Sequence, residues 1–398
     1  MADQGRIQQG GSQHGIARTS RVRTDDQRQR DLDRIAKYRD LEDQVRALAA
    51  AGDYTAPALF QLTSRLLRLN PEYYTTLGWV LMLDGVLEFF SFRHYSTLFH
   101  QLLVIVLGRD PARPRLPDSW EDWYNTETQD LAVIKSELAF TIPLLLESPK
   151  CYWIWSYRLW TLQQAIARLR PALARKIWEE ELGLASKMLG KDRRNFHAWG
   201  YRRHVVTQLE SAALQGSSMV EAEFAYTQNM IETDLSNFSA WHSRSRLIPR
   251  LLEERGAGEE ARRAFLDKEL TQIREALNVG PEDQSLWYYH QFLVLNLVAP
   301  EKHPAMTPGF TRDDRVAYLT REIDEIKELL EDYADVKLIY EGLFEYTVYL
   351  CRLQERQPDA GERADLAAWL AKLRQLDPMR NGRWADLERE VSLEGGNE

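Results

Sequence analysis

One short pattern decides the fold, because the chain repeats it at nearly even intervals. Its clearest copy is Asn195-Phe196-His197-Ala198-Trp199-Gly200-Tyr201-Arg202. The tryptophans of the four copies are Trp155, Trp199, Trp241 and Trp287. Their spacings are 199 − 155 = 44, 241 − 199 = 42 and 287 − 241 = 46 residues, close to the length of two helices and their turns. This period is typical of stacked helical hairpins, so we expect an all-α repeat array.

A helix pattern and a turn precede the tryptophan segments. Before Trp199, apolar residues follow one another at helical spacing and form one face: Trp178, Leu182, Ala185 and Leu189. Asp192 to Asn195 then supply turn and N-cap residues for the next helix. Weaker copies flank the clear ones, as expected for terminal repeats, and the first of them has Leu77 where the tryptophan is due.

These patterns predict a hairpin-repeat domain over residues 25–390, made of six or seven hairpins. Residues 1–24 are polar and glycine-containing, which favours a flexible arm, and residues 391–398 are predicted to be a disordered tail. Residues 78–118 are rich in Leu, Phe and Val and then in Pro. They interrupt the array, as either a lineage-specific insertion or a gene-model error.

Composition narrows the function class. A formal net charge of −9 argues against nucleic-acid binding, which needs a basic surface, and suits protein partners with basic patches. Only Cys151 and Cys351 are present, too few for a disulfide framework, which favours a reducing, cytoplasmic compartment. Charges such as Asp84 and Glu88 break the most apolar stretch, so we expect no membrane span. The first residues have no apolar core of a secretory signal.

No self-contained catalytic motif is present, so part of any active site would come from another chain. Lys150 precedes the helix of the first clear copy, where an ammonium group and the positive helix end together favour an anion such as a phosphate or diphosphate. Tyr152 could donate a further hydrogen bond. From the residues alone, a solvated lysine at a turn remains the alternative.

The repeated residues are interpreted as structural. The tryptophans are expected in the core, because an indole buries a large apolar area. The arginine three residues after each of the first three is expected to stack on an aromatic ring or to bond a carboxylate of the next repeat. His197 and His242, beside two of the tryptophans, are interpreted as interior or groove histidines. The repeat positions are Trp155, Arg158, Asn195, Trp199, Arg202, Asn237, Trp241, Arg244 and Trp287.

The pattern Asn-x-x-x-Trp-x-x-Arg at this spacing resembles the alpha subunits of protein prenyltransferases. The residues that carry the resemblance are 150–162, 195–206, 237–252 and 376–384, and His14-Gly15 with 21–24 is similar to the start of these subunits. Ser236 to His242 and the Leu-Ile-Pro-Arg-Leu-Leu run are similar to the Rab-specific branch, geranylgeranyltransferase type II. The resemblance covers roughly residues 14–76 and 125–390.

The resemblance implies a right-handed, crescent-shaped superhelix of hairpins around a beta subunit that binds zinc and holds geranylgeranyl diphosphate. It implies transfer of the geranylgeranyl group to C-terminal cysteines of Rab GTPases, which a Rab escort protein presents. Lys150 matches the family's lysine that contacts the leaving diphosphate, and Tyr152 and His197 match positions that line the same surface. The zinc would lower the pKa of the incoming cysteine thiol.

The chain departs from the family pattern at two places. In this branch the arm's histidine lies next to the initiator methionine and can reach the partner's zinc, whereas 13 residues precede His14 here. Residues 78–118 have no counterpart. The alternatives are an alpha subunit of farnesyltransferase or geranylgeranyltransferase type I, and a noncatalytic scaffold of tetratricopeptide type. The latter repeats near 34 residues, so the spacings of 42 to 46 disfavour it.

Overall fold

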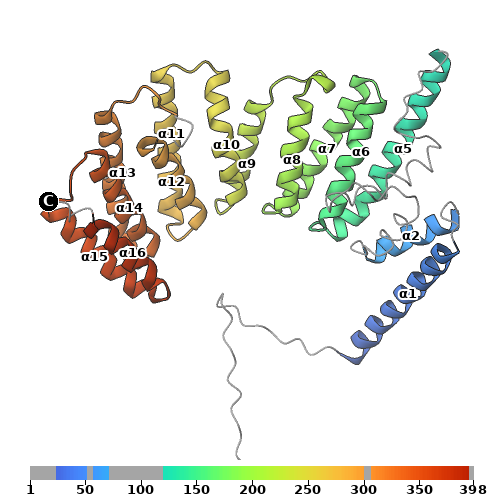
Figure 1. The fold of residues 1–398 in the computed structure, drawn as a ribbon, viewed down its shortest axis with the longest axis horizontal. Coiled ribbons are helices and arrows are strands. Elements are labelled where there is room, and N and C mark those ends of the chain that lie inside the picture. Colours follow the sequence, from blue (N-terminus) through green and yellow to red (C-terminus); the bar gives the residue numbers. More distant parts are fainter. Residues whose placement is uncertain (1–23, 52–56, 71–119, 300–305, 394–398) are drawn as a thin grey trace, which may run out of the picture. The chain divides into compact units, whose positions relative to one another are not determined.

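The computed structural model describes residues 24–51, 57–70, 120–299 and 306–393, and every regular element in these ranges is a helix (Figure 1). The all-α prediction is confirmed. The arm at 1–23 with His14, and the predicted insert at 78–118, lie outside the described residues, whereas the predicted tail begins inside the last helix. The α-helices are α1 (Asp25–Ala50), α2 (Pro57–Leu69), α5 (Trp120–Glu147), α6 (Tyr152–Arg168), α7 (Pro171–Lys191), α8 (Phe196–Leu209), α9 (Val220–Thr233), α10 (Phe238–Glu254), α11 (Glu259–Val279), α12 (Gln284–Val298), α13 (Arg312–Asp332), α14 (Lys337–Leu353), α15 (Ala360–Leu376) and α16 (Asn381–Leu393).

The chain divides into two compact units, residues 1–164 and 165–398. In the first unit, α1 packs on α2 through a cluster formed by Leu41, Val45 and Leu66. In the second unit, consecutive helices pair as hairpins from α7–α8 to α15–α16, and the hairpins follow one another side by side in chain order (Figure 1). The second helices of successive hairpins also pack on each other, α10 on α12 and α12 on α14.

The turn before each tryptophan helix is fixed by its own residues. Asn195 caps α8, because its side-chain oxygen accepts hydrogen bonds from the backbone N–H groups of His197 and Ala198 at 3.0 and 3.2 Å. Asn237 caps α10 in the same way. Its amide also donates to the carbonyl of Arg193 in the preceding hairpin, at 3.2 Å. The repeated asparagine therefore starts one helix and ties two hairpins together.

Each repeat tryptophan closes its turn with a hydrogen bond. The indole N–H of Trp199 donates to the carbonyl of Arg193 at 2.8 Å, and that of Trp241 donates to Leu235 at 2.8 Å, six residues back in both cases. Trp155 and Trp287 repeat the bond at 2.9 and 2.7 Å. A buried indole needs such a partner, since an unpaired N–H is costly. In the fifth hairpin Tyr340 replaces the tryptophan, and its hydroxyl donates to Ala334 at 2.7 Å.

The arginine of Trp-x-x-Arg joins neighbouring hairpins of the second unit. Arg202 on α8 forms two hydrogen bonds with Glu223 on α9, at 2.9 and 2.6 Å, and its guanidinium lies 3.4 Å from the ring centre of Tyr226. Arg244 on α10 bonds Glu269 on α11 at 2.8 and 2.7 Å. Both pairs are buried and bidentate, the geometry in which arginine binds a carboxylate most tightly.

A tyrosine two residues after the tryptophan completes this link. The hydroxyl of Tyr289 on α12 donates a hydrogen bond of 2.5 Å to Glu269 on α11, within one hairpin. Glu269 also binds Arg244 on α10, so it connects three helices. Tyr201 bonds Glu181 in the same manner at 2.5 Å. At the next joint His290 stands in the arginine position, with its Nε2 3.2 Å from Glu322 on α13. The contact between neighbouring hairpins is therefore an arginine–glutamate pair at two places and a histidine–glutamate contact at the third.

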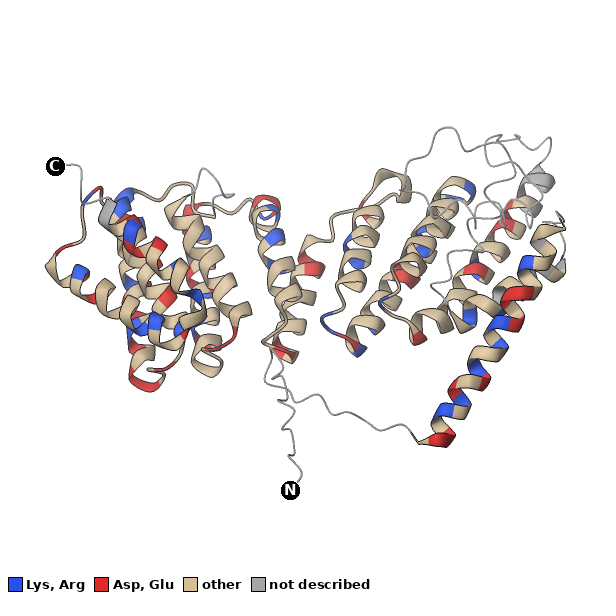
Figure 2. Ribbon diagram, turned by 60° about the horizontal axis from the view of Figure 1, so that its bottom comes forward, with Lys and Arg blue, Asp and Glu red and all other residues tan. Residues whose placement is uncertain are grey.

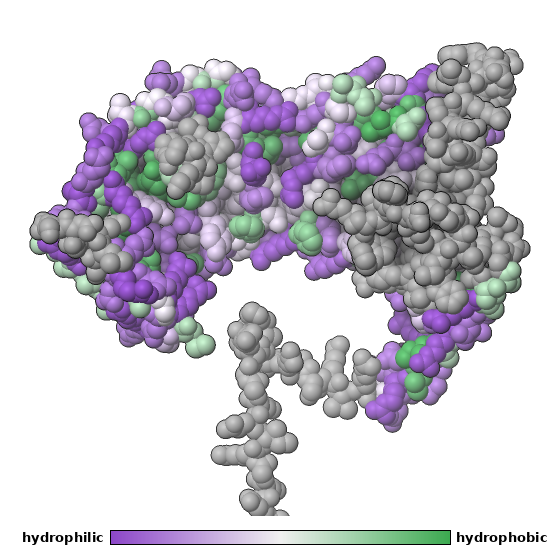
Figure 3. Space-filling view, viewed as in Figure 1, coloured by the Kyte–Doolittle hydropathy of each residue, from purple (hydrophilic) through white to green (hydrophobic). Residues whose placement is uncertain are grey.

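Acidic and basic residues are distributed along the helices, most densely along α1 (Figure 2). The coloured part of the face in Figure 3 is mainly hydrophilic, with small hydrophobic groups between. Among the helices that the structure describes, none combines the length and the apolar character needed to cross a membrane.

Candidate functional site

The first residue of each tryptophan-bearing helix occupies an equivalent position and is turned outward in the first three. Tyr152 opens α6 and is 43% exposed, Phe196 opens α8 and is 70% exposed, and Phe238 opens α10 and is 48% exposed. Large exposed rings at one repeat position are not needed for the core, which the tryptophans three residues later already fill. They are candidates for contact with a partner.

Lys150 lies in the turn between α5 and α6, two residues before Tyr152, and its side chain is exposed. The turn is rigidly held, because the indole of Trp155 donates to the carbonyl of Pro149 and the backbone N–H of Cys151 donates to Ser148 at 3.1 Å. These bonds hold the backbone of Lys150 beside the N-terminus of α6, and its exposed side chain carries an ammonium group. Both the charge and the helix end favour an anion there.

His197 lies in the first turn of α8, in the second unit, whereas Lys150 and Tyr152 belong to the first. Its ring is partly buried and lies 4.1 Å from the ring of Phe196, centre to centre. Burial lowers the pKa of His197 below its ordinary value, so the imidazole is neutral at neutral pH. A neutral imidazole can still donate one hydrogen bond, which suits contact with an anion more than proton transfer.

The structure adds Arg203 and Arg246 beside His242, two basic residues that the sequence analysis did not single out. His242 on α10 lies 6.0 Å from the ring of Phe238, and burial together with Arg203 and Arg246 lowers the pKa of His242. Tyr288, half exposed on α12, lies 6.1 Å from Phe238. The sequence signal was available, since helical spacing places Arg246 four residues after His242 on the same face.

The remaining repeat residues lie in the interior. Trp155, Trp199, Trp241 and Trp287 are between 1% and 6% exposed, and Arg158 is 1% exposed with its Nη1 bonded to the carbonyl of Leu138 at 2.6 Å. These residues build the hairpins and present the first-turn residues. In the part of the chain that the structure describes, no group of three or more His, Cys, Asp and Glu side chains is placed to hold a metal ion.

Comparison with known proteins matches this architecture. The protein prenyltransferase alpha subunit repeat matches residues 134–165, 178–209, 220–251 and 266–297. Each match covers parts of one hairpin, and the four are the hairpins α5–α6 to α11–α12.

Two relatives extend the comparison. The chain is 30% identical over 221 residues to the geranylgeranyl transferase type-2 subunit alpha of Schizosaccharomyces pombe, covering 54% of this chain and 62% of that protein. It therefore spans less than two thirds of that relative. It is 26% identical to the protein of the same name from Candida albicans, covering 94% of this chain and 97% of the relative.

A solved structure has the same fold. A chain of the Candida albicans protein geranylgeranyltransferase-I complexed with GGPP superposes with a TM-score of 0.51 at 17% identity, covering 89% of this chain and 91% of that one. The four matched repeats and the indole-closed turns make the chain similar, in sequence and in architecture, to protein prenyltransferase alpha subunits.

Proposed function

We propose that the chain is the alpha subunit of a heterodimeric type II protein geranylgeranyltransferase, active together with a beta subunit in the cytoplasm. The substrates are geranylgeranyl diphosphate and the C-terminal cysteines of Rab GTPases, presented by a Rab escort protein. The observation that carries the proposal is the similarity over 94% of the chain to a type-2 alpha subunit, which includes the repeats around the Lys150 turn. We assign the zinc, which would activate the cysteine thiol, to the beta subunit.

The role of this chain in the reaction is electrostatic. As the bond between the isoprenoid carbon and the diphosphate oxygen breaks, negative charge grows on the leaving diphosphate. A fixed ammonium at Lys150 stabilises that developing charge more than it stabilises the bound substrate, which lowers the barrier. The hydrogen-bonded turn matters because it holds the backbone from which the lysine side chain extends toward the diphosphate. The hydroxyl of Tyr152, two residues after Lys150, is a hydrogen-bond donor for the same diphosphate, and the neutral imidazole of His197 is a separate candidate donor on the second unit.

The experiment is reconstitution of the full chain with a beta subunit, followed by single-turnover transfer to a Rab GTPase bound to its escort protein. Lys150→Ala is expected to slow the chemical step roughly 10- to 100-fold while thiol binding stays intact. Lys135→Ala removes an exposed lysine on α5 and serves as the matched control, with the wild-type rate expected.

Each outcome separates the alternatives. Unchanged transfer by Lys150→Ala would remove its assigned role, and failure to form a complex would remove the proposed function. Transfer to short peptides with a C-terminal CaaX sequence, without escort protein, would instead assign the chain to the farnesyltransferase or type I enzymes.

A further inference from the structure

The hairpins of the second unit divide their charge unevenly between their two helices. The second helices α8, α10 and α12 carry five arginines against two glutamates, and both glutamates lie at the end of α10. The first helices α7, α9 and α11 carry eight basic against eleven acidic residues. In a chain with a formal net charge of −9, the second helices are therefore a basic part. A local excess of one sign favours a partner surface of the opposite sign.

The free part of this positive charge is carried by two side chains. Three of the five arginines are paired with carboxylates, namely Arg202, Arg244 and Arg250. The other two, Arg203 on α8 and Arg246 on α10, are exposed. Neither of them forms a salt bridge or a side-chain hydrogen bond with the described residues. Their charges are therefore available to a partner.

The two arginines act on the same histidine. Burial of the ring, and then the positive charges of Arg203 and Arg246, lower the pKa of His242, and no carboxylate offsets them. His242 lies four residues before Arg246, on the same face of α10. Cationic groups that gather without a counterion repel one another, and an anion bound among them removes this cost.

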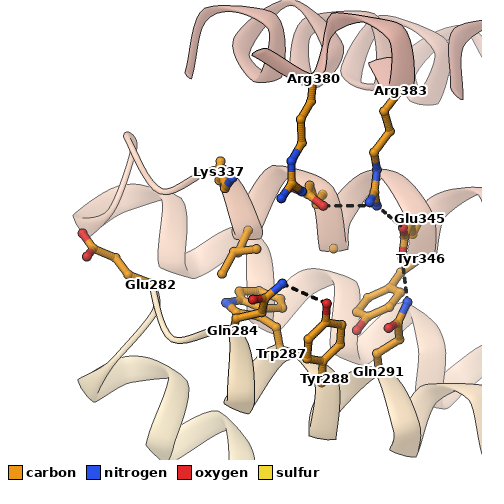
Figure 4. Close-up of a pocket in the computed structure, with 13 residues that line it drawn as sticks. Glu282, Gln284, Trp287, Tyr288, Gln291, Lys337, Glu345, Tyr346, Arg380 and Arg383 are labelled. Atoms are coloured by element: carbon orange, nitrogen blue, oxygen red, sulfur yellow. Dashed lines mark hydrogen bonds and ion pairs between the residues drawn. The ribbon is translucent and has the colours of Figure 1, made fainter. Parts of the chain in front are cut away.

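Aromatic rings lie next to these groups. The ring of Phe238 lies 6.0 Å from that of His242 and 6.1 Å from that of Tyr288, centre to centre. Phe238 is 48% and Tyr288 is 50% exposed. The hydroxyl of Tyr288 accepts a hydrogen bond from Gln284 at 2.8 Å, which orients the ring at the start of α12 (Figure 4). The basic patch is defined as Arg203, Phe238, His242, Arg246 and Tyr288.

A charged cleft next to Tyr288 shows the opposite arrangement. It has a volume of about 550 Å³, lies among α12, α14 and α16, and is lined by three carboxylates and three cations (Figure 4). Its Arg383 lies 3.2 Å from both Glu341 and Glu345. The cleft is therefore neutral and its cation is paired within the chain, whereas the basic patch lacks a counterion among the described residues.

The combination of charge and rings favours an acidic protein segment over a small anion. A phosphate ion can bind two guanidinium groups, but it makes no use of exposed aromatic rings. A segment with acidic side chains next to an apolar one uses both parts of the patch. Exposed aromatic rings and arginines are also the residues that are enriched in protein interfaces.

We propose that the basic patch binds an acidic segment of the beta subunit, with carboxylates on Arg203 and Arg246 and an apolar side chain on Phe238 and Tyr288. The identity of the partner rests on the proposed function, in which His197 is a candidate donor to the diphosphate held by the beta subunit. His197 and Arg203 lie on the same helix, α8, about 9 Å apart along its axis. A partner surface that reaches His197 therefore extends to the patch, and all these residues belong to the second unit.

The first test measures the dissociation constant of the full chain and the beta subunit. Arg203→Gln/Arg246→Gln is expected to raise it at least roughly 10-fold, with a weaker dependence on salt, and Arg203→Glu/Arg246→Glu is expected to raise it further. The matched control is Lys187→Gln/Lys268→Gln, which removes two exposed charges from α7 and α11 and should leave the constant unchanged. A wild-type constant for the arginine variants, or an equal loss in the control, would overturn the proposal.

The second test follows the pKa of His242 by nuclear magnetic resonance of histidine-labelled chain, with His242→Gln to assign the signal. In the free chain, Arg203→Gln/Arg246→Gln should raise this pKa, because two positive charges are removed. Binding of the beta subunit should raise it in the wild type, because carboxylates then neutralise the same charges. An unchanged pKa in the complex contradicts the proposal. The same rise in the free chain with inorganic phosphate would assign the patch to a small anion instead.

The results distinguish this inference from the proposed function. If the arginine variants bind the beta subunit with the wild-type constant while Lys150→Ala slows transfer, the assignment of the patch fails and the proposed function stands. If the wild-type chain binds no beta subunit, the proposed function fails first, and the partner assigned to the patch fails with it.

Discussion

Replacing Glu269 by glutamine tests whether the buried ion pairs hold successive hairpins together. Glu269 is 1% exposed and Arg244 is 2% exposed, and the two share a bidentate pair at 2.8 and 2.7 Å. The change keeps the shape of the side chain but leaves the guanidinium buried without its countercharge. Removing one partner of such a pair costs about 3–5 kcal/mol. The hydroxyl of Tyr289 also loses its ionised acceptor, which adds to the loss.

This loss is large against the stability of a domain, about 5–15 kcal/mol. Because each hairpin contacts mainly its neighbours, we expect α9–α10 and α11–α12 to uncouple rather than the whole unit to unfold at once. Urea unfolding followed by far-ultraviolet circular dichroism should broaden into two phases. Hydrogen exchange should quicken first at the α10–α11 joint.

Two further variants make the measurement decisive. Glu275→Gln, an exposed site on α11, should change the free energy of unfolding by less than about 0.5 kcal/mol. Arg244→Met with Glu269→Leu replaces both charges by apolar groups and should recover more than half of the loss, although Tyr289 then lacks a partner. A loss below about 1 kcal/mol for Glu269→Gln, with a single sharp transition, would refute the assignment of the joint to this pair.

Three other changes have defined outcomes. Trp199→Phe removes the indole hydrogen bond that closes its turn and should lower the free energy of unfolding, measured with urea, by about 1–3 kcal/mol. Trp178→Phe is the control and should cost less, because the indole N–H of Trp178 makes no hydrogen bond with the described residues. Equal losses would contradict the role of the bond. Gly342→Ala would place a methyl group 2.8 Å from a carbon of the neighbouring indole ring, so we expect a loss of about 1–3 kcal/mol and a lower melting temperature; an unchanged one would show that α12 and α14 can separate freely. The Arg356 guanidinium holds the pKa of Glu362 at about 2, below the ordinary value of 4.5, so the pair stabilises the fold above pH 4.5 and this contribution disappears as the pH falls toward 2. Melting temperatures of the wild type and Glu362→Gln should therefore converge over that range, and parallel curves would contradict the assignment.

The hairpins could be predicted from the sequence because their signals are local. The tryptophan period, the capping residues and the apolar stripes each depend on spacings within about one repeat. The fifth hairpin shows the limit of the pattern. The expected tryptophan is missing there, yet Tyr340 makes the same bond to the carbonyl six residues back. The requirement is for a ring with a donor at its far end, which more than one residue type meets.

The sequence predicted that the repeated arginines bind carboxylates or aromatic rings, but it did not predict which residues these are. Arg202 bonds a glutamate 21 residues later, and Arg244 bonds one 25 residues later. The separation follows the length of the loop between hairpins, which the tryptophan period does not fix. The replacement of arginine by His290 at the next joint was likewise not anticipated, because the pattern was defined on the first three copies.

The candidate site was predicted in part. Lys150 was identified from its place before a helix, and the structure shows the exposed side chain on a fixed turn. Its role with Tyr152 and His197 remains a prediction. The cleft could not be foreseen, because its walls come from α12, α14 and α16, and only packing in three dimensions brings Glu341 and Arg383 together.

The indole bonds that close the turns give the protein a set of internal optical reporters. Trp155, Trp199, Trp241 and Trp287 each sit at one joint, dry and bonded to a backbone carbonyl. When a joint opens, its ring meets water, and its emission should shift to longer wavelength. The fifth joint has Tyr340 in this position and gives no tryptophan signal. Variants that keep a single tryptophan would show in which order the other four joints open.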